Sequence, residues 1–78
     1  MLSVKQAKMI AEKKIVGDFK KCILYDDKYV FLIETEENGN YDPFYFVDAN
    51  TGKFGGFSFI TDADPKRFTD LMMNKNLL

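Results

Sequence analysis

The chain has 78 residues and a formal net charge of −1, and 46% of its residues are hydrophobic while 29% are charged. This composition is too apolar for a disordered chain, and the length predicts one small α+β domain over residues 1–78. Histidine is absent and Cys22 is the only cysteine, which excludes an intrachain disulfide and removes the commonest ligand of zinc and copper.

The first predicted element is an amphipathic helix from Ser3 to about Val16. Its apolar residues recur at helical spacing, at Val4, Ala7, Ile10, Ala11 and Ile15. Ser3 is a favourable N-cap, and Gly17 is suited to end the helix in a left-handed turn. Lysines interrupt the apolar residues, so this segment lacks the unbroken apolar run of an export signal. No stretch reaches the roughly 18 apolar residues of a membrane span, and we expect a cytoplasmic protein.

Two strands are predicted next, over Phe19–Asp26 and Lys28–Glu36. They follow each other so closely at Asp26-Asp27 that a hairpin is the connection to expect. In the second strand, large apolar residues occupy both alternating sides. This pattern predicts a central strand of a sheet.

After the turn-forming run "ENGNYDP", a second hairpin is predicted from "FYFVD" and "KFGGFSFI" around the loop "ANTG". If the strands pair symmetrically about this loop, Tyr45 lies opposite Gly56 and Phe46 lies opposite Gly55. Large rings then cover glycines that have no side chain of their own to pack. The glycine pair therefore needs no ligand to explain it.

The last predicted element is a helix in "DADPKRFTDLMM", with Asp64 as N-cap and Pro65 at its first position. Phe68, Leu71 and Met72 form its apolar stripe. The order is an N-terminal helix, a four-stranded antiparallel meander and a C-terminal helix, or αββββα. The most economical packing puts both helices on one face of the sheet, which predicts a two-layer α+β fold.

Charge is unevenly distributed along the chain. Residues 1–21 carry a net charge of +4, residues 22–50 carry −6, and residues 51–78 carry +1. Such polarity can steer a charged partner toward the protein. A solvated basic helix beside a solvated acidic hairpin explains the same pattern without a partner.

Few residues suit catalysis or cofactor binding. Cys22 lies inside a predicted strand without an obvious base, and the neighbouring Lys21 points to the opposite side, so a structural thiol is favoured. Carboxylates gather where turns and helix caps favour acids, at Asp26-Asp27, Glu36-Glu37 and Asp62/Asp64. "DANTG" does not match a calcium loop, because Phe59 stands where that loop needs a bidentate carboxylate. We expect neither enzymatic activity nor a metal or other cofactor.

The segment "KFGGFSF" resembles the strand signature of RNA-recognition motifs and cold-shock domains. That resemblance implies that Phe57 and Phe59 stack on bases. The acidic charge of the flanking strands opposes the attraction of phosphates, which supplies most nonspecific affinity for nucleic acid. Single-stranded nucleic-acid binding through Phe57 and Phe59 is therefore the alternative function, with nucleic acid the less favoured partner.

A second resemblance spans more of the chain. The helix "SVKQAKMIAEKKI", the strands after it and "FYFVDANTGKF" resemble the PepSY-type domain, in which strands end in a Val-Asp-Ala-x-Thr-Gly turn. The matching residues are Val47, Asp48, Ala49, Thr51 and Gly52. The resemblance implies a small α+β module that binds or inhibits a partner protein and has no cofactor.

The strands carry more aromatic residues than one covered face can bury. With both helices on one face, the other face exposes rings, which is typical of a partner or dimer interface. We therefore predict a non-enzymatic protein-binding module of the inhibitor, immunity or mobile-element accessory type, whose partner is another protein or a second copy in a homodimer. The predicted partner-binding residues are Tyr29, Phe31, Phe44, Phe46, Phe57 and Phe59. Of these, Phe44, Phe57 and Phe59 are expected to share a side.

Overall fold

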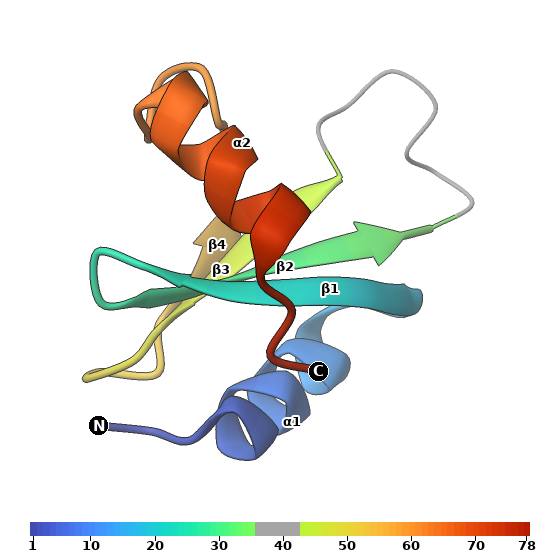
Figure 1. Cartoon of the computed structure of the whole chain (residues 1–78). Coiled ribbons are helices and arrows are strands. Elements are labelled where there is room, and N and C mark those ends of the chain that lie inside the picture. Colours follow the sequence, from blue (N-terminus) through green and yellow to red (C-terminus); the bar gives the residue numbers. More distant parts are fainter. Residues whose placement is uncertain (36–42) are drawn as a thin grey trace.

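The computed structural model describes residues 1–35 and 43–78 (Figure 1). Its helices are α1 (Val4–Lys14) and α2 (Pro65–Asn74), and its strands are β1 (Asp18–Tyr25), β2 (Lys28–Glu34), β3 (Phe44–Asp48) and β4 (Phe54–Gly56). The strands form an antiparallel sheet in the order β1-β2-β3-β4. This confirms the predicted α+β class and the order αββββα. Within the described ranges, no helix is long and apolar enough to cross a membrane.

Both helices begin at the N-caps that the sequence indicates. The hydroxyl of Ser3 accepts the backbone N–H of Gln6, and the Gln6 side chain accepts the N–H of Ser3, which makes a capping box. The carboxylate of Asp64 accepts the N–H of Lys66 at the start of α2. These bonds satisfy backbone donors that have no partner inside a helix.

The two hairpins have the predicted turns. Asp26 and Asp27 connect β1 to β2 with φ angles of 46° and 62°, the left-handed conformations that a two-residue hairpin of type I′ requires. Gly52 supplies the left-handed residue between β3 and β4, with a φ of 77°. The pairing across this hairpin is Tyr45 with Gly56 and Phe46 with Gly55, as predicted.

The last strand is shorter than the sequence indicates. β4 ends at Gly56, whereas the predicted strand continued to Ile60. The chain leaves the sheet because Ser58 and Asp62 close a turn: the Ser58 N–H donates to the Asp62 carboxylate (2.9 Å), and the Asp62 N–H donates to the Ser58 carbonyl (2.8 Å). The residues after β4 are thereby directed toward α2.

The helices lie on opposite faces of the sheet, so the prediction of a two-layer fold with both on one face is wrong (Figure 1). On one face, Ala7 and Ala11 of α1 pack in a cluster that contains Phe31. On the other face, Phe68 of α2 packs in a cluster that contains Val30. Phe31 and Val30 are neighbours on β2, so their side chains point to opposite faces of the sheet, and both are fully buried. A central strand that is apolar on both sides needs a cover on each, and the result is three layers.

The predicted Val-Asp-Ala-x-Thr-Gly turn ties the start of α1 to the sheet. The Asp48 carboxylate accepts the backbone N–H groups of Asn50 (2.8 Å) and Thr51 (2.9 Å). The fully buried Ala49 accepts a hydrogen bond from the N–H of Leu2 (2.7 Å) and donates its own N–H to the turn between β1 and β2 (2.8 Å). This motif therefore has a structural role in this chain.

Asp48 should make the stability of the fold sensitive to acid. The N–H groups of Thr51 and then Asn50 hold the pKa of Asp48 below its ordinary value. A carboxyl whose folded-state pKa is lowered contributes its full stability above its unfolded pKa of about 4, and that contribution is lost as the pH falls through the folded-state pKa. We expect Asp48→Asn to flatten the acid limb of a plot of Tm against pH. Asp70→Asn on exposed α2 is the control, and an unchanged acid limb in Asp48→Asn would contradict the assignment.

Candidate functional site

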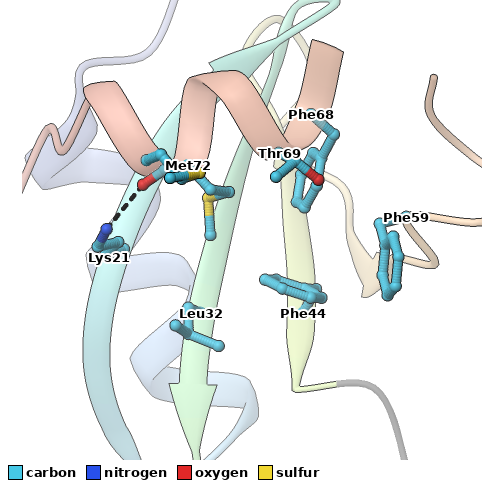
Figure 2. A pocket seen from close by; sticks show the side chains of 8 residues that line it. Lys21, Leu32, Phe44, Phe59, Phe68, Thr69 and Met72 are labelled. Carbon is cyan, nitrogen blue, oxygen red and sulfur yellow. Dashed lines mark hydrogen bonds between the residues drawn. The ribbon is translucent and has the colours of Figure 1, made fainter. Parts of the chain in front are cut away.

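An apolar pocket of about 300 Å³ lies between α2 and the sheet (Figure 2). We call it the α2 pocket, and it is lined by Lys21, Leu32, Phe44, Phe59, Phe68, Thr69, Met72 and Met73. Its volume is at the lower end of the range of ligand pockets, which is about 300–1,000 Å³. The pocket therefore suits one or two side chains of a partner or a small apolar ligand.

Ring contacts and one hydrogen bond position α2 over the sheet. Phe68 is 2% exposed and meets Phe44 edge to face, with 5.1 Å between ring centroids. The hydroxyl of Tyr25 on β1 accepts the backbone N–H of Asp64 (2.8 Å), just before the helix begins. Arg67 lies 4.3 Å from the centroid of the Tyr25 ring, a distance typical of a cation–π contact. The first turn of α2 is thus fixed against the hairpin end of β1.

The charged residue of the pocket is held by the other end of α2. The ammonium of Lys21 donates to the carbonyl of Met72 at 2.7 Å (Figure 2). That carbonyl belongs to the last turn of the helix, where the backbone lacks intrahelical donors and the helix dipole favours a cation. Lys21 therefore stabilises the end of α2, and rings and aliphatic groups form most of the remaining lining.

The six predicted partner-binding residues do not share one face. Tyr29 and Phe31 lie on the α1 face and are 5% and 0% exposed. The other four lie on the α2 face: Phe44, Phe46, Phe57 and Phe59. The prediction that Phe44, Phe57 and Phe59 share a side is confirmed. Within residues 1–35 and 43–78, the expected uncovered aromatic face is not found, because each face of the sheet carries a helix.

The four rings on the α2 face differ in accessibility. Phe57 is 4% exposed and packs against two other rings, so it cannot form half of a base-stacking platform in this fold. Phe46 is half-buried, and its ring lies against Gly55. Phe44 and Phe59 are also half-buried, contact each other edge to face at 6.0 Å, and line the α2 pocket. The pocket thus brings together Phe44 and Phe59 from the predicted set.

Sequence reasoning missed the α2 side of the pocket. It assigned Phe68 and Met72 to an apolar stripe that packs on the sheet, and it did not consider Met73. Met73 is 75% exposed at the edge of the pocket. The available signal was the pair Met72-Met73, since the second methionine falls beside the stripe and flexible methionines are typical of adaptable binding surfaces.

The described residues offer little for catalysis. Cys22 is fully buried, and burial raises the pKa of its thiol to about 12, so the reactive thiolate is absent near neutral pH. The predicted acidic pairs at Asp26-Asp27 and Asp62/Asp64 lie in a hairpin turn, a loop turn and a helix cap. Glu36-Glu37 lie outside the described residues. In residues 1–35 and 43–78, no group of three or more acidic residues or cysteines is placed to hold a metal ion.

Comparison with known proteins identifies a family that shares part of this chain. The family model of PepSY, the peptidase propeptide and YPEB domain, matches residues 1–54. The match contains α1, β1, β2, β3 and the Asp48 turn, and it ends before the segment that carries Phe59 and α2. No curated protein and no solved structure gave a significant match. PepSY domains have propeptide and inhibitor-like roles toward proteases and are generally non-catalytic. Because the family model covers more than half of the chain, the protein belongs to the PepSY family.

Proposed function

We propose that this protein is a non-enzymatic protein-binding module of the inhibitor type, and that its α2 pocket receives an apolar side chain of the partner. The observation that carries the proposal is the pocket itself, which is open and apolar although both faces of the sheet have a helix. The propeptide and inhibitor-like roles of PepSY domains support it. The free thiol of Cys22 supports a reducing, cytoplasmic location for the interaction.

The lining of the pocket has the chemistry of an interface anchor. Phe44 and Phe59 are half-buried, and Met73 remains mostly exposed in the free protein. A partner side chain in the pocket would remove their apolar surface from water, which contributes about 25 cal/mol per Å². Residues that insert into such pockets dominate the energetics of many interfaces, while the surrounding contacts contribute little.

Affinity capture with matched variants tests the proposal. The full chain is immobilised in three forms, which are wild type, Met73→Lys and Met9→Lys. Each form is incubated with extract of the native host. Met73→Lys places an ammonium at the edge of the pocket, in a helical turn where a cation is tolerated. Met9 is exposed on α1, on the other side of the sheet, so Met9→Lys adds the same charge away from the pocket.

We expect a protein that wild type and Met9→Lys retain equally and that Met73→Lys binds at least about tenfold more weakly. Identification of that protein as a peptidase, with its activity reduced when it is bound, would support the inhibitor type. Equal capture by all three forms would contradict binding through the pocket. Retention of single-stranded RNA that falls steeply with added salt would instead indicate nucleic-acid binding, by a surface other than the buried Phe57.

A further inference from the structure

The C-terminal tail, residues 75–78, crosses the outer edge of β1 (Figure 1). Among the strands of the described residues, β1 comes first in the sheet order β1-β2-β3-β4 and is therefore an edge strand. The N–H of Leu77 donates to the carbonyl of Cys22 at 2.8 Å, and the N–H of Cys22 donates to the side-chain oxygen of Asn76 at 3.2 Å. The backbone N–H and C=O of Cys22 point away from β2, and both are hydrogen-bonded to the tail.

We propose that the outer edge of β1 is a strand-pairing surface for a second copy of this chain, and that the tail competes with that copy. Antiparallel strands pair through the N–H and C=O groups of alternate residues. On β1 these include the two groups of Cys22 that the tail occupies. Pairing of two β1 edges and docking of the tail therefore exclude each other.

The charges along β1 select a second copy as the occupant. Two β1 strands that pair antiparallel about Ile23 put Cys22 of one copy opposite Leu24 of the other, so that outward-facing alternate residues bond to each other. Counted from Ile23 in that register, Lys20, at the register irregularity of β1, falls opposite Asp26, the residue directly after β1 of the other copy. The arrangement is symmetric, so the dimer gains this contact between opposite charges twice.

The groups that would form these contacts are accessible. Lys20 pairs with Asp18 at 2.8 Å in the free chain, and Asp26 pairs with Arg67 at 2.8 Å. All four side chains are about half exposed or more. Such exposed ion pairs contribute little to stability, so breaking them costs little. The edge can therefore adopt the new pairing without loss of a buried contact.

The tail is a weak cover. Leu77 and Leu78 are 43% and 44% exposed, so the tail buries only part of its apolar surface. Asn76 contributes a side-chain oxygen where a neighbouring strand would contribute a backbone carbonyl. Edge strands without a firm cover tend to pair with another chain. A change that releases the tail should therefore shift the protein toward the dimer.

Leu77→Pro in the full chain tests this competition, because proline lacks the N–H that bonds to Cys22. The matched control is Leu78→Pro, since the N–H of Leu78 bonds to Asn76 inside the tail (3.1 Å) and not to β1. Sedimentation measures the dimer dissociation constant, and hydrogen exchange measures protection of the Cys22 amide. We expect Leu77→Pro to lower the dimer Kd about tenfold or more and to speed exchange at Cys22 in the monomer. Leu78→Pro should resemble the wild type.

Adding Lys20→Glu to Leu77→Pro should weaken the dimer, because like charges then replace opposite charges at both symmetric contacts. A monomeric Leu77→Pro with fast exchange at Cys22 would overturn the second copy as the occupant. Unchanged exchange in both Leu77→Pro and Asn76→Ala/Leu77→Pro would overturn the role of the tail. A dimer whose Kd is indifferent to Lys20→Glu would overturn the register. Met73→Lys in the α2 pocket should not affect this dimer, so the two proposals fail separately.

Discussion

Phe68→Ala should destabilise the protein by about 3–5 kcal/mol, the range for removal of a buried phenylalanine ring. A single core in a domain of this size supplies about 3–5 kcal/mol of stability in total. We therefore expect the variant to be largely unfolded, or to retain α1 and the sheet without a docked α2.

The size of the effect follows from the position of Phe68 in its cluster. It is the buried residue of α2, and its ring centroid lies 5.1 Å from that of Phe44 and 5.4 Å from that of Phe57. Tyr25 and Phe59 also contact it, at 6.0 Å and 6.2 Å. Truncation removes the ring around which the others pack and leaves a cavity that they cannot all fill.

Thermal unfolding followed by circular dichroism measures the loss. Met73→Ala is the control, since Met73 lies on the same helix but is largely exposed. The free energy of unfolding of this variant should differ from that of the wild type by no more than about 0.5 kcal/mol. If Phe68→Ala melts cooperatively near the wild-type Tm, then α2 is not part of the cooperative fold. That result would also remove the α2 pocket as a stable site.

Local chemistry made the order of the elements, the starts of both helices and the two hairpin turns predictable. Ser3 and Asp64 are N-cap residues by type, and Asp26-Asp27 separates two apolar runs by the two residues that a tight hairpin needs. The turn before Gly52 is likewise set by nearby residues, through bonds to the Asp48 carboxylate. In each case, the interaction spans only a few positions in the chain.

The placement of the helices depends on contacts between distant parts of the chain. The alternation in β2 indicated two apolar sides, but it did not assign a helix to each side. α2 follows β4 and could pack on either face, since both faces of the sheet are apolar. Burial decides between them: if both helices shared one face, either Phe31 or Val30 would be exposed.

The candidate site was half predictable for a related reason. Alternation shows which residues share a side within one strand, but a register shift of one residue moves a whole set to the other face. The observed register pairs Leu32 with Phe44 and Val30 with Phe46. Phe44 and Phe46 therefore lie on the face of Leu32 and Val30, whereas the sequence interpretation grouped them with Phe31, which lies on the other face.

Gly17→Ala should destabilise the protein by about 1–3 kcal/mol, as expected for overpacking. The sequence suggested that Gly17 ends α1 in a left-handed turn, but the helix ends at Lys14 and Gly17 does not have a positive φ. Its role is a close approach to the end of β2. A Cβ atom there would lie 2.7 Å from Cγ2 of both Ile33 and Thr35, and 2.8 Å from the backbone oxygen of Glu34. The side chains can shift, but the backbone oxygen is part of the sheet.

Gly56→Ala is the matched control, because a Cβ atom at Gly56 has no atom within 4 Å other than those of Gly56 and its two chain neighbours. Both substitutions add one methyl group and reduce the freedom of the unfolded chain in the same way, an effect that by itself stabilises by about 0.4–1 kcal/mol. Urea unfolding should therefore show a lower midpoint for Gly17→Ala and an unchanged or higher midpoint for Gly56→Ala. Equal midpoints would mean that the segment before β1 can move away from β2 without loss, and that the glycine is not required for the packing of the α1 face.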